Sequence, residues 1–549
     1  GILNIQNGGA VSTTQSLVIG SNSGANGTVN LTGSGSTLTA SEALVVGSQG
    51  TGALNVGAGT TVAAKNLFIG YSDNGAGAVT ISGAGASLTT AAGAYLGYGA
   101  NATASLVVEN GASLETVSNG LYVKGGSTMT VTGTGTGAGA QTTLNIGSAH
   151  SGVPSTWGDS DGWLYIGKGT VNVSAGAQVT TDGLYVSGEN TPDGNATMTV
   201  TGPGTVLDGK LCIYVGGDGN ANSATGDGTL TFSDGATGSA SVIATGNNPG
   251  TTGTILLTGA GSSLSSVYNN TTFTGKVYAG YEGNGIITVQ NGASLSSADQ
   301  IRIAWNSGST GTLNIGAAEG QAATAAGTVT ATNGVVFGDG TGTVVFNHTD
   351  ANYAFAPAIS GAGSVKVLSG TTVFTSANTY SGDTIIGDGA TLKAGAVNVF
   401  SPNSNVTVNL NGVLDLNNFD QTIAGLNGSG EVLLGTATLT VLGDSNYNFN
   451  ISGSGGLTQE GPGTLVLTGY NTYYGDTVIS QGTIQAGATN TLSANSTVNV
   501  RSGGALDLNN YNQTIAGLTG SGSVTLGSAT LTVGRSEEHT SELQSLAYL

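Results

Sequence analysis

Apolar and polar residues alternate along short stretches of this chain, and glycines separate the stretches. In residues 28–32, Val29 and Leu31 stand between polar neighbours. A period of two places both apolar side chains on one face of an extended strand. Gly33 and Gly35 follow directly and favour a turn. The 3.6-residue period of a helix is absent from the pattern, which therefore predicts an all-β chain.

The pattern repeats about every 25 residues from residue 1 to about residue 316, and repeats of that length are typical of solenoids. Copies read VNLTGSGSTLTASEALVVG at 29–47, LNVGAGTTVAAKNLFIG at 54–70 and VTISGAGASLTTAAGAYLG at 79–97. Each copy predicts three short strands, and one copy cannot bury its own apolar face. We therefore expect the copies to stack as a triangular parallel β-helix of roughly 20 coils.

A longer repeat begins near residue 343. The stretch NTYSGDT at 378–384 returns as NTYYGDT at 471–477, and DLNNFDQTIAGL at 415–426 returns as DLNNYNQTIAGL at 507–518. The change predicts two parts of one solenoid, 1–342 with short repeats and 343–534 with repeats of about 92 residues whose second copy is truncated.

The residues after Gly534 depart from both patterns. The stretch RSEEHTSELQS at 535–545 resembles the translation of a common sequencing-library adapter. Glu537, Glu538 and Glu542 interrupt the apolar alternation, and no glycine turn follows. We therefore expect 535–549 to be a non-native tail that does not continue the coils.

The longer repeat carries a resemblance to a known family. Residues 461–484, GPGTLVLTGYNTYYGDTVISQGTI, resemble the autotransporter-associated β-strand repeat, and 369–392 resemble a weaker copy. The short repeats, with their L-Y-V-G and N-G-A-S-L pieces, are similar to repeats of type V secretion passengers. The resemblance implies a fragment of a bacterial autotransporter passenger. It also implies a right-handed β-helix exported across the outer membrane to the cell surface or outside the cell. In that family an outer-membrane barrel follows, which we expect in the missing C-terminal part.

Composition narrows the function further. The formal net charge is −20 and the pI is about 4.1, which disfavours nucleic acid and anionic membranes as partners. The single cysteine excludes an intrachain disulfide framework. Gly158–Gly162 matches G-x-S-x-G, but a strand pattern follows where a nucleophile elbow needs a helix, so a turn is the better interpretation.

Other candidate sites also lack the residues that their chemistry needs. Residues 204–211 match the start of a phosphate loop, but Leu211 replaces the hydroxyl residue that would hold Mg²⁺. A stretch that begins at Asp218 starts like a calcium-binding loop, but Ser223 and Thr229 replace the required Gly and Glu. Loose calcium binding by Asp218 and Asp227 stays open as an alternative. The sequence thus predicts no cofactor, no metal and no catalytic site.

An aromatic residue often occupies the centre of the third strand of the repeat. Its apolar neighbours, as in Leu121-Tyr122-Val123, are expected to point into the core, so alternation points the aromatic ring outward. These residues, the aromatic row, are Phe68, Tyr95, Tyr122, Tyr165, Tyr185, Tyr214 and Tyr278. The aromatic row either binds a ligand along its length or has only a structural role, in which aromatic residues that suit half-buried strands stack on their neighbours.

The sequence therefore predicts a non-catalytic surface rod, either an adhesin or a structural stalk. The expected partner is a host or neighbouring-cell surface, with a glycan as one candidate ligand. The alternative is a β-helix polysaccharide lyase or hydrolase, which would gather carboxylates on one face. Here the acidic residues are sparse and scattered, as at Asp182, Asp208, Asp299 and Asp339.

Overall fold

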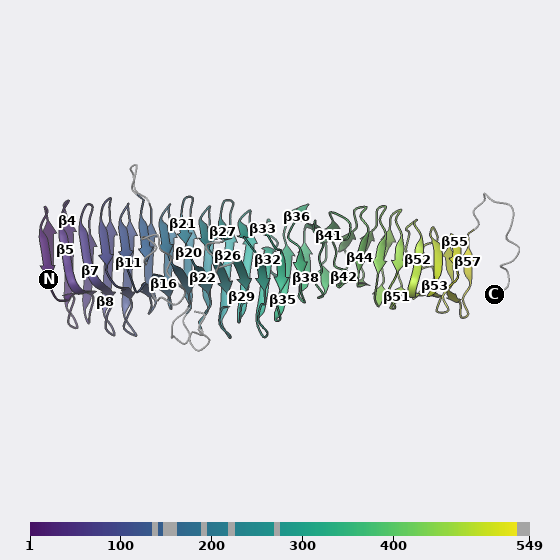
Figure 1. The fold of residues 1–549 in the computed structure, drawn as a ribbon, viewed down its shortest axis with the longest axis horizontal. Helices are drawn as coiled ribbons and strands as arrows, with labels where there is room; N and C mark the ends of the chain where they lie inside the picture. Colours follow the sequence, from purple (N-terminus) through teal and green to yellow (C-terminus); the bar gives the residue numbers. More distant parts are fainter. Residues whose placement is uncertain (134–140, 147–161, 188–194, 218–225, 268–274, 535–549) are drawn as a thin grey trace. The chain divides into compact units, whose positions relative to one another are not determined.

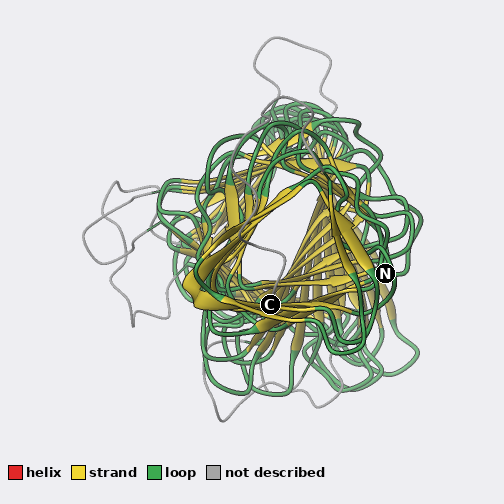
Figure 2. Cartoon of the chain, turned by 90° about the vertical axis from the view of Figure 1, so that its right-hand side faces the viewer, coloured by secondary structure: helices red, strands yellow, loops and turns green. Residues whose placement is uncertain are grey.

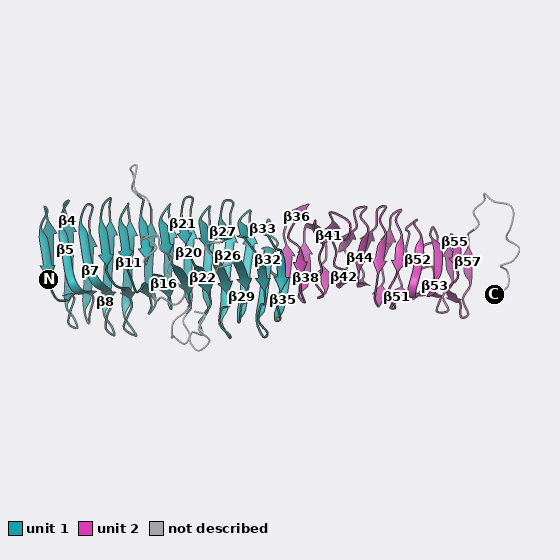
Figure 3. Cartoon of the chain, viewed as in Figure 1, with its two compact units in different colours: residues 1–343 teal, residues 344–549 magenta. Residues whose placement is uncertain are grey.

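The computed structural model describes residues 1–133, 141–146, 162–187, 195–217, 226–267 and 275–534. These residues form strands and turns without a helix, as Figure 2 shows in yellow and green. The prediction of an all-β parallel β-helix is confirmed. Two compact units, Gly1–Thr343 and Val344–Leu549, divide the chain (Figure 3). The strand β35 (Thr341–Asn347) contains the boundary.

In the first unit, each turn of the chain, or coil, contributes three strands, and each strand pairs in parallel with its counterpart in the next coil (Figure 1). The first ladder contains β1 (Ile2–Gln6), β4 (Asn26–Thr32), β6 (Thr51–Val56), β8 (Ala76–Ser82), β11 (Thr103–Glu109), β14 (Ser127–Thr132), β17 (Gly169–Ser174), β20 (Ala196–Thr201), β23 (Gly228–Ser233), β26 (Thr252–Thr258), β29 (Asn284–Gln290) and β32 (Thr310–Gly316).

The second ladder contains β2 (Ala10–Thr13), the first half of β5 (Thr37–Val46), the first half of β7 (Thr61–Ile69), β9 (Ser87–Thr90), β12 (Ser113–Thr116), β15 (Thr143–Ile146), β18 (Gln178–Thr181), β21 (Val206–Asp208), β24 (Thr237–Ala240), β27 (Ser263–Ser266), β30 (Ser294–Ser297) and β33 (Thr328–Ala331). The third contains β3 (Leu17–Ile19), the second halves of β5 and β7, β10 (Ala94–Leu96), β13 (Leu121–Val123), β16 (Trp163–Ile166), β19 (Gly183–Val186), β22 (Cys212–Val215), β25 (Val242–Thr245), β28 (Lys276–Ala279), β31 (Ile301–Ile303) and β34 (Val335–Phe337).

The core of this unit follows the alternation in the sequence. Val29 and Leu31 of the first ladder, Leu38 of the second, and Leu44 and Val46 of the third are all buried. Because the pairing joins like positions of successive coils, as Val29 joins Leu54, the apolar residues stack into continuous columns. Each coil therefore buries its apolar face against its neighbours, which is how a solenoid obtains a core.

The second unit has shorter coils and three ladders of its own. The first contains β38 (Ser364–Ser369), β40 (Thr384–Ile386), β42 (Asn405–Val408), β45 (Gly425–Gly428), β48 (Ser445–Tyr447), β51 (Thr464–Leu467), the second halves of β52 (Thr477–Ala486) and β53 (Thr497–Asp507), and β56 (Ser523–Thr525). The others contain β36 (Tyr353–Phe355), β39 (Thr371–Phe374), β41 (Thr391–Ala394), β43 (Val413–Asp415), β46 (Glu431–Leu433) and β49 (Ile451–Ser452), then β44 (Gln421–Ile423), β47 (Leu439–Val441), β50 (Leu457–Gln459), the first halves of β52 and β53, and β55 (Gly517–Gly520). The remaining strands are β37 (Ile359–Ser360), β54 (Gln513–Ile515) and β57 (Leu531–Val533).

The long repeat does not contain a whole number of these coils. Thr384 begins β40 in the first ladder, whereas its repeat counterpart Thr477 begins β52 in the ladder that contains β50. Coil lengths here run from 18 residues, between Leu439 and Leu457, to 22 residues, between Thr384 and Val406. Equivalent residues of the two copies therefore lie on different faces of the solenoid.

Candidate binding surface

The third ladder of the first unit brings the aromatic row together. Register pairs Phe68 with Tyr95, Tyr95 with Tyr122, and Tyr122 with Tyr165. The ladder continues from Tyr165 through Tyr185, Tyr214 and Ala244 to Tyr278. The residues on either side of each ring, such as Leu164 and Ile166, are fully buried. The rings therefore lie on the outer side of the strands, where alternation places them.

Most rings of the row stack on one another. Ring centroids are 5.0 Å apart between Phe68 and Tyr95 and between Tyr95 and Tyr122, 4.8 Å between Tyr122 and Tyr165, and 4.9 Å between Tyr165 and Tyr185. The angles between these ring planes are 5° to 12°. The faces of the inner rings therefore contact other rings. Those faces are therefore not open to a ligand.

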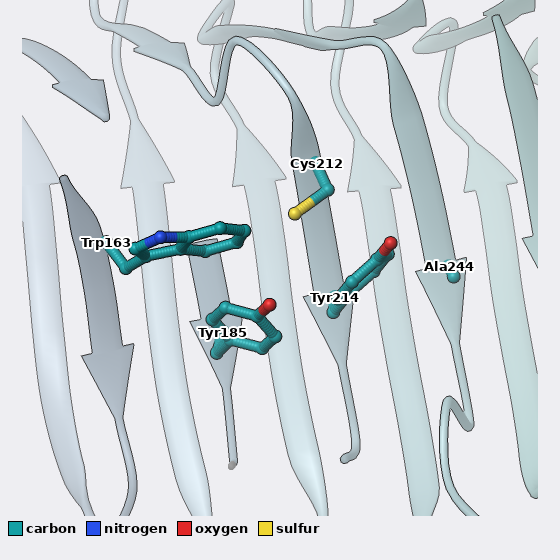
Figure 4. Packing of buried hydrophobic residues seen from close by; sticks show 5 residues of the cluster. All are labelled: Trp163, Tyr185, Cys212, Tyr214 and Ala244. Carbon is teal, nitrogen blue, oxygen red and sulfur yellow. The ribbon is translucent and has the colours of Figure 1, made fainter. Parts of the chain in front are cut away.

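Two rings of the row, Tyr185 and Tyr214, are covered. Trp163 and Cys212 each lie two residues before a row tyrosine and share its side of the strand. Together with Tyr185, Tyr214 and Ala244 they form a buried cluster outside the main core (Figure 4). Tyr185 and Tyr214 are each only 7% exposed. Burial also raises the pKa of the Cys212 thiol well above its ordinary value, so this thiol stays protonated.

Two tyrosines outside the row form an exposed pair at its N-terminal end. Tyr71 is 39% exposed and Tyr98 is 53% exposed. Their rings stack with centroids 5.5 Å apart and an interplanar angle of 8°. The edge of Tyr71 contacts Phe68 at 5.0 Å, and Tyr98 contacts Tyr95 at 5.9 Å, in both cases between centroids. The exposed pair therefore packs against two residues of the aromatic row.

The register positions that adjoin the exposed pair in the neighbouring coils are occupied by small residues. Backbone bonds Tyr71 N–H to Gly47 O and Ser48 N–H to Gly20 O place Ser48 one coil before Tyr71. In the same way, Lys124 N–H donates to Leu96 O, which places Gly125 one coil after Tyr98. Serine and glycine leave room beside the rings, and a flat apolar surface of a ligand fits against such faces.

The exposed pair was not predicted from the sequence, although the chain carries a signal for it. An aromatic residue, any residue, glycine and a second aromatic residue occur in order at Phe68–Tyr71, Tyr95–Tyr98 and Tyr278–Tyr281. The glycine has a positive φ in each case, 67° at Gly70 and 66° at Gly97. This backbone turn brings the second ring over the first.

The other candidate motifs do not assemble a site in the described part of the chain. Residues 158–161 of the G-x-S-x-G match and 218–225 of the calcium-like loop lie outside the described residues. Residues 204–211 contain the short strand β21 and a turn, with Lys210 ion-paired to Asp208. Among the described residues, no group of three or more His, Cys, Asp or Glu side chains is placed to hold a metal ion.

Several described carboxylates form ion pairs with lysines. Asp299 pairs with Lys276 at 3.7 Å, and Asp415 pairs with Lys393 at 3.1 Å. Asp182 is buried in the turn before β19. Where the structure is described, no helix is long and apolar enough to cross a membrane.

Comparison with known proteins identifies relatives of both units. The passenger-associated-transport-repeat family matches residues 369–394 and 457–486. The chain is 29% identical over 505 residues to a protein named Adhesin BmaC autotransporter, from Brucella suis biovar 1 (strain 1330); the match covers 87% of this chain and 14% of that protein. It is also 36% identical over 189 residues to a protein named Uncharacterized lipoprotein YdeK, from Escherichia coli (strain K12); this match covers 32% of the chain and 14% of that protein.

The comparisons confirm the resemblance that the sequence motifs indicated. The matched family segments contain the two stretches of the longer repeat on which that resemblance rested. The chain spans 14% of the length of each of these relatives. Together, the repeat family and the similarity to an autotransporter adhesin support an autotransporter passenger and indicate export to the cell surface.

Proposed function

We propose, on the premise that this chain is part of an exported autotransporter passenger, that it is a non-catalytic adhesive rod. Its contact surface is the exposed pair, Tyr71 and Tyr98, resting on Phe68 and Tyr95 of the aromatic row. The partner is the surface of a host or neighbouring cell, contacted through a glycan. The observation that carries the proposal is the exposure of two stacked rings that adjoin Ser48 and Gly125 rather than large side chains.

Physical chemistry supports a ligand with a flat apolar face, such as a sugar ring. Aromatic side chains supply a large rigid contact area, and they lose little conformational entropy on binding. Tyr71 and Tyr98 are already held by stacking and by edge contacts to Phe68 and Tyr95. A preorganised surface loses less free energy to ordering when its ligand binds.

The alternative function, a polysaccharide lyase or hydrolase, has less support. Glycoside hydrolysis requires two carboxyl groups facing the same bond, separated by roughly 5 to 9.5 Å. The described carboxylates Asp208, Asp299 and Asp415 each pair with a lysine instead. The relative that covers most of the chain is named an adhesin.

Replacing both exposed tyrosines, Tyr71→Ser with Tyr98→Ser, is expected to weaken retention on the bound polysaccharide by about 10- to 100-fold, the range typical of losing aromatic anchors. Stability should also fall, by about 1 to 3 kcal/mol, because the change removes the stack between the two rings and their edge contacts to Phe68 and Tyr95, so affinity is expressed per folded molecule. The measurement is the affinity of size-selected monomer for a panel of immobilised polysaccharides.

The matched control replaces two stacked row residues, Tyr122→Ser with Tyr165→Ser. Three ring stacks are then lost, at a cost of about 2 to 4 kcal/mol in stability. Affinity per folded molecule should be unchanged, because the stacked faces are not available to a ligand. If instead the control abolishes binding and the exposed-pair variant does not, the contact surface has been assigned to the wrong tyrosines.

A further inference from the structure

An arginine takes the place of the aromatic ring near the C-terminal end of the third ladder in the first unit. Arg302 of β31 pairs in register with Tyr278 of β28. Its guanidinium carbon lies 3.8 Å from the ring centroid of Trp305 and 5.6 Å from that of Tyr278. Tyr281 packs edge-on against Tyr278, with centroids 5.1 Å apart. The cation is therefore bordered by aromatic rings.

The guanidinium keeps most of its hydrogen-bonding capacity. Arg302 Nε donates to Gln300 Oε1 at 3.0 Å, and Nη1 donates to Tyr278 Oη at 3.3 Å. A guanidinium has five N–H donors in a fixed fork, and three of them, including both on Nη2, have no partner among the described residues. The two bonds and the indole fix the orientation of the fork before any ligand arrives.

No carboxylate of the described residues forms an ion pair with Arg302. The nearby acid Asp299 pairs with Lys276 at 3.7 Å and accepts a hydrogen bond from Asn333 at 2.7 Å. What distinguishes Arg302 from the exposed Arg501 is that its guanidinium is held in place by Trp305, Tyr278 and Gln300. A charge that is oriented but unpaired favours an external anion with matching geometry.

An open groove is lined by loop residues that follow this cluster in the sequence of successive coils. Glu282 and Asn306, which directly follow Tyr281 and Trp305, line it together with Asn284, Ser307 and Thr310. Its volume is about 610 Å³. Amides and hydroxyls predominate in the lining, and such groups suit a ligand that carries many hydroxyls.

We propose that Arg302, Tyr278 and Trp305 form a binding site for a carboxylate-bearing sugar of an acidic glycan. The carboxylate accepts two parallel hydrogen bonds from the guanidinium fork, while the aromatic rings contact the body of the sugar. Neighbouring neutral sugars of the same glycan lie in the groove. The carboxylates of Glu282, in the groove, and of Asp339, one coil after Trp305, disfavour further anionic sugars that do not engage the fork. The site is separate from the exposed pair and does not depend on it.

The test measures the affinity of the whole chain, as size-selected monomer, for aldotetraouronic acid, a xylotriose that carries a single glucuronate. We expect tighter binding of this acid than of its methyl ester, which keeps the sugars and loses the charge. Arg302→Gln should weaken binding of the acid by about 10- to 100-fold, as expected for loss of charge-assisted hydrogen bonds. Arg302→Lys should recover only a small part, because an ammonium lacks the fork. Both variants should leave polysaccharide binding by Tyr71 and Tyr98 unchanged.

Arg501→Gln is the matched control, because it removes the same charge from an exposed arginine bonded only to Ser480 Oγ among described residues. It should leave the affinity unchanged. Thermal unfolding of each variant shows whether it is folded, and Arg302→Lys preserves most of the packing if Arg302→Gln does not fold. The proposal would be overturned if the unaltered chain did not bind, or if the methyl ester bound as tightly as the acid. Equal losses of affinity in the Arg501 and Arg302 variants would also overturn it. Equally tight binding of poly-glutamate would indicate an acidic peptide as the ligand instead.

Discussion

Asn378→Ala is expected to lower the free energy of unfolding of the second unit by about 3 to 5 kcal/mol, because it leaves two or three buried polar groups unsatisfied at about 1 to 3 kcal/mol each. The Asn378 amide oxygen accepts from Ile359 N–H at 2.7 Å. Its amide nitrogen donates to Val399 O at 2.6 Å and to Ser376 O at 3.1 Å. The side chain is only 2% exposed, so water cannot replace these partners without opening the coil.

The second copy of the long repeat supplies an internal replicate. Asn471 accepts from Ile451 N–H at 2.8 Å and donates to Thr491 O at 2.7 Å. Asn471→Ala should therefore have a similar effect, although this asparagine lies on another face of the solenoid. Asn403→Ala is the control, since its exposed amide donates only to Thr379 O at 3.1 Å. Urea unfolding of the three variants measures the differences; losses below about 1 kcal/mol at both buried sites would contradict the assignment.

Gly253→Val is expected to destabilise the first unit by about 3 kcal/mol or more, through overpacking against backbone that cannot move independently. A Cβ at Gly253 would lie 1.9 Å from Val215 O. The position belongs to a column of glycines, because Gly228, Gly253, Gly285 and Gly311 pair in register. A side chain added at Gly253 therefore pushes its coil away from the preceding coil, which contains Val215.

Gly250→Asn is the control for the glycine column. Gly250 has a φ of 78°, but a Cβ added there would have no other atom within 4 Å, and asparagine tolerates this backbone region. Its effect should stay below about 1 kcal/mol. Thermal unfolding followed by circular dichroism compares the two variants. Similar midpoints for Gly253→Val and the unaltered chain would show that the column accommodates side chains.

Strand positions in the first unit were predictable because burial follows a period of two. Val29 and Leu31 face the core, and the flanking residues of Tyr122 do as well. That rule does not say what the outward rings contact. The stacking of Tyr122 on Tyr165 follows from the register of two coils 43 residues apart in sequence, which only the three-dimensional pairing shows. Coverage of Tyr185 and Tyr214 is likewise a tertiary effect.

The long repeat shows a different limit of sequence reasoning. Similar residues at Thr384 and Thr477 predict similar local contacts, and the structure agrees: Tyr380 and Tyr473 each bond the hydroxyl of the threonine four residues later. The same similarity does not predict that Thr384 and Thr477 lie on the same face of the solenoid. They do not, because the long repeat does not contain a whole number of coils. Arg302 was not predicted as a site residue because the aromatic row was defined by aromatic residues alone. It became a candidate because it lies against Trp305 and because no described carboxylate forms an ion pair with it.

We propose that this chain binds a surface glycan without changing its covalent structure. The direct test incubates folded, size-selected monomer with a panel of immobilised neutral and acidic polysaccharides, and then measures both the retained protein and any released sugar. We expect retention on at least one polysaccharide with no new reducing ends and no unsaturated products. Release of such products in proportion to the amount of protein would contradict it and would favour the lyase or hydrolase function.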